Sequence, residues 1–220
     1  MKLSKQTVNL LSNYSDINDS IVINEGNRLT TVSVGLNILA EAIVDEEFPC
    51  KFAIYDLAQF LKALRLFNDP ELIFSKNYVT LHEGKDRLRY YFADPNVVIV
   101  PPEDGLELPS QEVTFQVNER QLNKLNQAAS LLDLPDLSAI GRDGSIFLSV
   151  GERENGTTNA WEVEVGETDH TFLFNFKIEN VKVLPGTYDV SISKQCLSYW
   201  KNTSSDLSYF VAVEPDPQFE

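Results

Sequence analysis

The side chains of this sequence that are best placed to act on another molecule are basic residues at helical spacing. Lys62 and Arg65 follow Ala58 at intervals of four and three residues, so a helix would present all three on one face. The opposite face would be apolar and consist of Leu57, Phe60, Leu61, Leu64 and Phe67. One face therefore fits a core, and the other carries only positive charge.

This helix would follow a strand and begin at a cap. Within Phe52–Phe67, strand-forming residues lead to Asp56, whose carboxylate can cap the first turn. Leu3–Tyr14 has the same amphipathic spacing, and so has Glu119–Leu132 after the cap Asn118. Phe172–Leu184 again predicts a strand that leads into a short helix.

The charges of the chain are unevenly divided between these helices and the remaining sequence. A net charge of −15 by itself argues against nucleic acid. The four helical segments, counted as Lys2–Tyr14, Asp56–Phe67, Asn118–Leu132 and Phe176–Leu184, nevertheless hold eight of the 18 basic residues and three of the 33 acidic ones. The eight are Lys2, Lys5, Lys62, Arg65, Arg120, Lys124, Lys177 and Lys182. Any one such face could be an ordinary solvated surface. The shared sign of all four, however, predicts a molecule with a basic side on its helices and an acidic side on its sheets.

No group of residues has the spacing of a catalytic or metal site. His82 and His170 are isolated, and Asp45–Glu47 is typical of a solvated loop. Cys50 and Cys196 are far apart, which favours a reduced, cytosolic compartment. The sequence has no apolar run of about 20 residues and no apolar stretch at its start. We therefore predict no enzyme, no cofactor, no metal and no membrane partner.

The two halves of the sequence repeat one order of elements. Each half runs helix, strands, strand into helix, strands, which predicts an α+β fold of two pseudo-repeated domains. The prolines and acidic turn of 94–111 indicate a connector between a domain at 1–93 and a domain at 112–220. The strands predicted in the first domain are Ser20–Ile23, Arg28–Val34, Leu36–Val44, Glu71–Phe74, Tyr78–His82 and Arg87–Phe92. Those predicted in the second are Val113–Val117, Ile146–Val150, Asn159–Val165, Tyr188–Ser193 and Tyr209–Val213.

Four short segments carry a resemblance to a known family. Met1–Lys5, Ala53–Leu57, Ala93–Pro95 and Tyr209–Pro215 resemble the sliding clamps of T-even-type bacteriophages. Those clamps are DNA polymerase processivity factors, related in fold to proliferating cell nuclear antigen. The resemblance spans the whole chain and implies two clamp domains, each with two short helices packed on antiparallel sheets. It also implies that three chains close head to tail into a ring around double-stranded DNA.

The resemblance gives the basic helix faces a role, because the helices of such rings line the central hole. The residues that would face DNA are Lys5, Lys62, Arg65, Arg120, Lys124, Lys177 and Lys182, with Lys2 at the rim. Contacts from cations to phosphates carry no base information, so binding would be independent of sequence.

The resemblance also implies two protein-binding surfaces. Edge strands would join neighbouring chains, with Arg87 and Arg89 on one strand and Glu162 and Glu164 on the other. A pocket for the C-terminal peptide of the polymerase, also used by an ATP-dependent clamp loader, would include Leu39, Val98, Ile99, Val100, Val213 and Pro215. Phage late-transcription factors are further expected partners, and the expected location is the cytoplasm of the infected bacterial host.

Two hypotheses from other classes stay open on the sequence alone. One is an acidic, β-rich phage structural or scaffold protein without a DNA role. The other is a monomeric DNA mimic that presents its negative surface to a DNA-binding enzyme. Both leave the basic helix faces unexplained.

Overall fold

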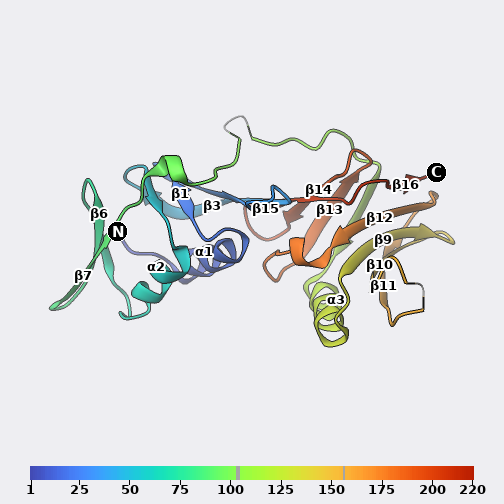
Figure 1. The fold of residues 1–220 in the computed structure, drawn as a ribbon, viewed down its shortest axis with the longest axis horizontal. Helices are drawn as coiled ribbons and strands as arrows, with labels where there is room; N and C mark the ends of the chain where they lie inside the picture. The colour runs from blue at the N-terminus through green and yellow to red at the C-terminus, as the bar shows by residue number, and fades with distance from the viewer. Residues whose placement is uncertain (103–104, 156) are drawn as a thin grey trace. The chain divides into compact units, whose positions relative to one another are not determined.

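The computed structural model describes residues 1–102, 105–155 and 157–220 of the chain (Figure 1). The chain divides into two compact units, Met1–Asp104 and Gly105–Glu220. Both units combine antiparallel strands with short helices, which agrees with the predicted α+β class. None of the helices in the described part of the chain is long and apolar enough to cross a membrane.

Two helices of the first unit pack against each other, α1 (Lys5–Ile17) and α2 (Leu57–Leu64) (Figure 1). Each begins at a side-chain cap, because Ser4 Oγ accepts from the backbone N–H of Thr7 and Asp56 accepts from that of Gln59. The apolar stripe predicted for the second helix is buried from Leu57 to Leu64. Both sequence-predicted helices of this unit are therefore confirmed.

The strands of the first unit form three antiparallel groups. β1 pairs with β4, β2 pairs with β3, and β5, β6 and β7 form a meander in which β7 is an edge. Their bounds are β1 Ile21–Ile23, β2 Gly26–Val32, β3 Ile38–Phe48, β4 Phe52–Ile54, β5 Glu71–Phe74, β6 Tyr78–Glu83 and β7 Asp86–Tyr91. The prediction of a loop at Asp45–Glu47 is wrong, since β3 runs through it.

The strands of the second unit form two antiparallel groups. The first has the order β11-β10-β9-β12-β16, and the second contains β15, β14, β13 and β8 in that order. Their bounds are β8 Val113–Val117, β9 Asp136–Arg142, β10 Ser145–Gly151, β11 Trp161–Glu167, β12 Phe172–Lys177, β13 Tyr188–Ser193, β14 Leu197–Asn202, β15 Leu207–Ala212 and β16 Gln218–Phe219. β9, β14 and β16 were not among the predicted strands.

Only one of the two helices predicted for the second unit is found in its described residues. α3 (Glu119–Leu132) matches its prediction and packs against β10 and β11. The helix predicted over Phe176–Leu184 is wrong. β12 continues to Lys177, and a single 3-10 turn, η2 (Ile178–Asn180), follows. Phe172, Phe174 and Phe176 are all buried, so the period of two, typical of a strand, overrides the helical spacing.

Candidate functional site

The basic side chains of α2 lie on its solvent face. Lys62 and Arg65 are exposed, whereas Phe60, Leu61 and Leu64 are buried on the other side of the helix. The amphipathic division expected from the sequence therefore holds, and the exposed face of α2 is cationic.

α1 brings a further cation beside α2. Lys5 is the first residue of α1 and is exposed. It lines a groove of about 450 Å³ together with Arg65, and Asn9 and Ser12 contribute polar groups to the same groove. Lys2 is also exposed, but it is ion-paired with Asp69, and this hydrogen bond raises the pKa of the lysine.

A carboxylate from β3 fixes the start of α1. Glu46 accepts hydrogen bonds from the backbone N–H of Ser4 and, at 2.5 Å, from Thr7 Oγ1. Burial acts to raise the pKa of Glu46, but these hydrogen bonds outweigh it and leave the pKa below its usual value of 4.5. Because the carboxylate sits at the N-terminus of α1, it also complements the helix dipole.

The exposed face of α3 in the second unit is also cationic. Arg120 and Lys124 are exposed, while Leu122 and Leu125 are buried. Lys124 Nζ lies 5.7 Å from the ring centroid of Trp161, within the range of a cation–π contact.

The two remaining cations do not lie on a helix. Lys177 ends β12, and its Nζ is 2.6 Å from Oδ1 of the buried Asp136. Lys182 is exposed in the segment after η2. The expectation of a helical basic face for these two residues is therefore wrong, and the contact with Asp136 explains Lys177 as part of the fold.

The two strands predicted to join neighbouring chains are both edges of their sheets. Among the residues that the structure describes, β7 pairs only with β6, and β11 only with β10. Arg87 and Arg89 of β7 are exposed, and Arg89 lies over the ring of Tyr78 at 4.5 Å. On β11, Glu162 accepts from Arg142 at 2.5 Å.

Glu164, the other predicted acidic residue of β11, also already has a hydrogen bond within the chain. Its carboxylate accepts from Ser145 Oγ at 2.9 Å. The opposite charges of β7 and β11 thus lie on sheet edges. Their role in joining neighbouring chains stays a prediction.

The predicted peptide-pocket residues differ in exposure. Leu39, Val98 and Val213 are buried, whereas Pro215 is exposed and Ile99 and Val100 are 43% and 49% exposed. Val98 packs with Val22 and Ala53 in a small cluster of the first unit. Val98 therefore anchors the connector, and its two neighbours present apolar side chains to solvent.

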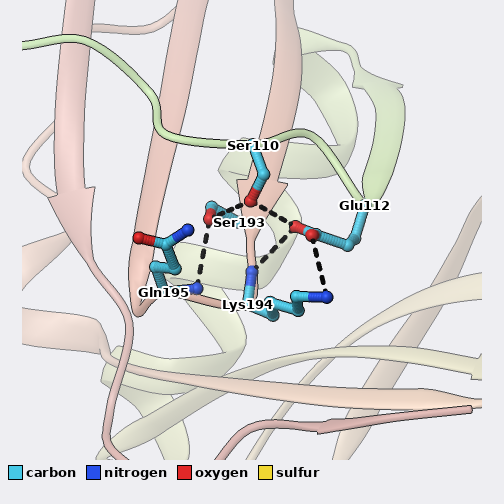
Figure 2. A network of polar contacts seen from close by, with 5 residues as sticks. All are labelled: Ser110, Glu112, Ser193, Lys194 and Gln195. Carbon is cyan, nitrogen blue, oxygen red and sulfur yellow. Dashed lines mark hydrogen bonds and ion pairs between the residues drawn. The ribbon is translucent and has the colours of Figure 1, made fainter.

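The other end of the connector is held by a polar network in the second unit (Figure 2). Ser110 Oγ donates to Glu112 at 2.8 Å and shares a hydrogen bond of 2.7 Å with Ser193 Oγ. Glu112 also accepts from the backbone N–H of Lys194 at 3.0 Å, and Ser193 Oγ accepts from that of Gln195. Burial acts to raise the pKa of Glu112, but these hydrogen bonds and the Lys194 charge lower it overall. This network fixes the entry into β8 at the turn between β13 and β14.

The residues considered for catalysis do not gather into a site. His170 packs against Phe219 with 4.8 Å between the ring centroids, and His82 faces Arg87 across the strand pair β6–β7. Cys50 and Cys196 are both free. Within the described residues there is no group of three or more His, Cys, Asp or Glu side chains able to hold a metal ion.

Comparisons with known proteins agree with the arrangement of these elements. The family profile described as "gp45 sliding clamp, C terminal" matches residues 114–215. The chain is 32% identical to the sliding clamp of Vibrio phage KVP40 over 97% of this chain and 99% of that protein. It is 26% identical to the sliding clamp of Escherichia phage RB69 over 98% of both chains.

A solved structure extends the likeness to the fold. Proliferating cellular nuclear antigen from Entamoeba histolytica superposes with a TM-score of 0.67 at 11% identity, over 94% of both chains. Two units of antiparallel strands with exposed cationic helices, and a whole-length match to a phage clamp, thus lead to one conclusion: the chain belongs to the phage gp45-type sliding clamps, the non-catalytic processivity factors of DNA polymerases.

Proposed function

We propose that three copies of this chain close into a ring around duplex DNA and hold the replicative polymerase on its template. The observation that carries the proposal is the exposed cationic face of α2 and of α3, each with buried apolar residues on its other side, together with the exposed Lys5 at the start of α1. Membership of the clamp family leaves the scaffold and DNA-mimic alternatives without support.

The side chains proposed to face DNA are those that the helices hold in solvent. They are Lys5, Lys62, Arg65, Arg120 and Lys124, with Lys2 and Lys182 as outlying members. Their attraction to phosphates is independent of sequence and weakens with salt. A closed ring needs only weak contacts of this kind, because topology keeps it on the DNA while it slides.

The experiment that tests this role reverses the charge of α2. Lys62→Glu combined with Arg65→Glu should sharply reduce processive extension of a primed circular template by the phage polymerase and loader, while the trimer stays intact. Lys51→Glu with Lys76→Glu is the matched control, since both lysines are exposed in the same unit and lie outside the helices. Equal processivity of the two double variants would refute the assignment of α2.

The ring itself is proposed to close through β7 of one copy and β11 of the next. In the described part of the chain each strand has one unpaired edge, and their exposed charges are opposite in sign, which favours head-to-tail pairing. Three chains of 24.8 kDa give a particle of about 74 kDa, so light scattering tests the trimer directly. A monomer at micromolar concentration would contradict it.

The proposed docking surface for partners lies on the connector and the C-terminal segment. Exposed apolar side chains at Ile99 and Val100 suit a short apolar peptide such as the C-terminus of the polymerase, and the ATP-dependent loader would use the same residues. Late-transcription factors of the phage are further proposed partners. The proposed location is the cytoplasm of the infected bacterium.

A further inference from the structure

The side-chain amide of Gln121 connects the N-terminus of α3 to the edge strand β11. Gln121 Oε1 accepts from the backbone N–H of Asn118 at 3.0 Å and completes the capping box of α3. Gln121 Nε2 donates to the backbone carbonyl of Glu164 at 3.0 Å. One side chain therefore both begins the helix and ties it to a strand 43 residues away.

A second contact connects the same two elements. Lys124, one turn after Gln121, lies over Trp161, the first residue of β11. Trp161 is 43% exposed, so its indole remains accessible beside the cationic face of α3. α3 is thus tied to β11 at the first residue of the strand and at its middle.

The first unit contains the same relationship between a basic helix and an edge strand. Tyr90 of β7 donates from its hydroxyl to the backbone carbonyl of Asp56, the cap of α2, at 3.0 Å, and Gln59 Oε1 lies 3.3 Å from the same hydroxyl. Its ring packs edge-on against Phe60, with 5.1 Å between the centroids. α2 therefore rests on β7 as α3 rests on β11.

We propose that Gln121 and Tyr90 are positioning residues that couple contact with DNA to closure of the ring. The inference rests on the proposed function, in which α2 and α3 face DNA and β7 and β11 join the copies. DNA phosphates that fix the positions of α2 and α3 would act through Tyr90 and Gln121 on the edge strands. β7 and β11 would then be held in the geometry in which they pair between chains. Such coupling is a free energy shared between the two contacts, so duplex DNA in the hole would stabilise the closed ring and thereby slow exchange of subunits between rings.

A matched pair of variants in α3 isolates the tie to β11. Gln121→Glu keeps an acceptor for the capping box but removes the donor to the Glu164 carbonyl. Asn126→Asp makes the same change from amide to carboxylate at an exposed position of the same helix, away from the face of Arg120 and Lys124. In the first unit, Tyr90→Phe removes only the hydroxyl, and Tyr55→Phe makes the same change at a side chain that is 68% exposed.

The measurement is subunit exchange between donor- and acceptor-labelled assemblies, with and without a linear duplex of about 40 base pairs at about 50 mM salt, where phosphate contacts are strong. DNA should slow exchange of the wild type and of the two control variants. For Gln121→Glu and Tyr90→Phe, the slowing factor should fall about two- to tenfold, the range for one lost hydrogen bond.

Two results would overturn the inference and leave the ring intact. One is a wild type whose exchange is unaffected by the duplex. The other is a Gln121→Glu slowing factor equal to that of Asn126→Asp. Failure of the proposed function looks different, because light scattering would then find no trimer in any variant.

Discussion

Lys177 and Asp136 face each other across the strand pair β12–β9, with Nζ 2.6 Å from Oδ1. The Asp136 side chain is 6% exposed, and its other carboxylate oxygen accepts from the backbone N–H of Arg153 at 2.9 Å. The hydrogen bond to Asp136 raises the pKa of Lys177. The lysine thus supplies the countercharge that a buried carboxylate requires.

Lys177→Met should therefore lower the free energy of unfolding by about 2 kcal/mol, because it leaves the Asp136 carboxylate buried without its cation. Urea denaturation followed by circular dichroism measures the change. Lys201→Met is the control, since Lys201 pairs with the exposed Asp206 at 3.4 Å. Exposed pairs contribute roughly 0–1 kcal/mol, so equal losses in the two variants would contradict a fold role for Lys177.

The elements that the sequence predicted well depend on local signals. Val113–Val117, Glu119–Leu132 and Tyr188–Ser193 have the bounds found in β8, α3 and β13. Alternation of apolar residues and a capping asparagine are readable within a few positions. The cationic faces of α2 and α3 follow from the same periodicity, which explains why the central part of the site could be predicted.

The elements that the sequence did not predict depend on distant neighbours. β9 contains Gly141, and glycine is a poor strand former. It is suited to this position because an added Cβ would lie 2.4 Å from the Phe172 ring of the next strand. The ties formed by Gln121 and Tyr90 span 43 and 34 residues, so no local pattern reveals them. Neither contact was therefore predicted from the sequence.

The carboxylate of Glu46 should make the first unit sensitive to acid. Its pKa is lowered in the folded state, so its contribution to stability is present above about pH 4.5 and is lost as the pH falls through the folded-state pKa. Glu46→Gln should lower the stability near pH 7 by up to about 1 kcal/mol, since the carboxylate is only partly buried. Its difference from the wild type should shrink below about pH 4.5 in thermal unfolding experiments. Glu47→Gln, an exposed neighbour on β3, should show neither effect.

Substitutions at two adjacent residues of the connector should distinguish its attachment to the first unit from its proposed binding of a partner peptide. Val98→Ala removes methyl groups that pack on Val22 and Ala53, so the first unit should lose about 1–2 kcal/mol of unfolding free energy. Ile99→Ala alters a side chain that is 43% exposed, and stability should stay within about 0.5 kcal/mol. Calorimetric titration with the polymerase C-terminal peptide should show weaker binding for Ile99→Ala. Unchanged peptide affinity in that variant would remove Ile99 from the proposed docking surface.

The charges of β7 and β11 allow the proposed ring interface to be tested by exchange of sign. Arg87→Glu with Arg89→Glu should convert the trimer to monomers, and so should Glu162→Lys with Glu164→Lys, because each sets like charges against each other across the joint. These substitutions also remove the contact of Arg89 with the Tyr78 ring and the ion pair of Glu162 with Arg142. A thermal melt of each variant should therefore confirm that the units stay folded. The four substitutions combined should restore the mass of the trimer in light scattering, since opposite charges again meet between copies. If the combined variant stays monomeric while folded, the two strands do not face each other in the ring.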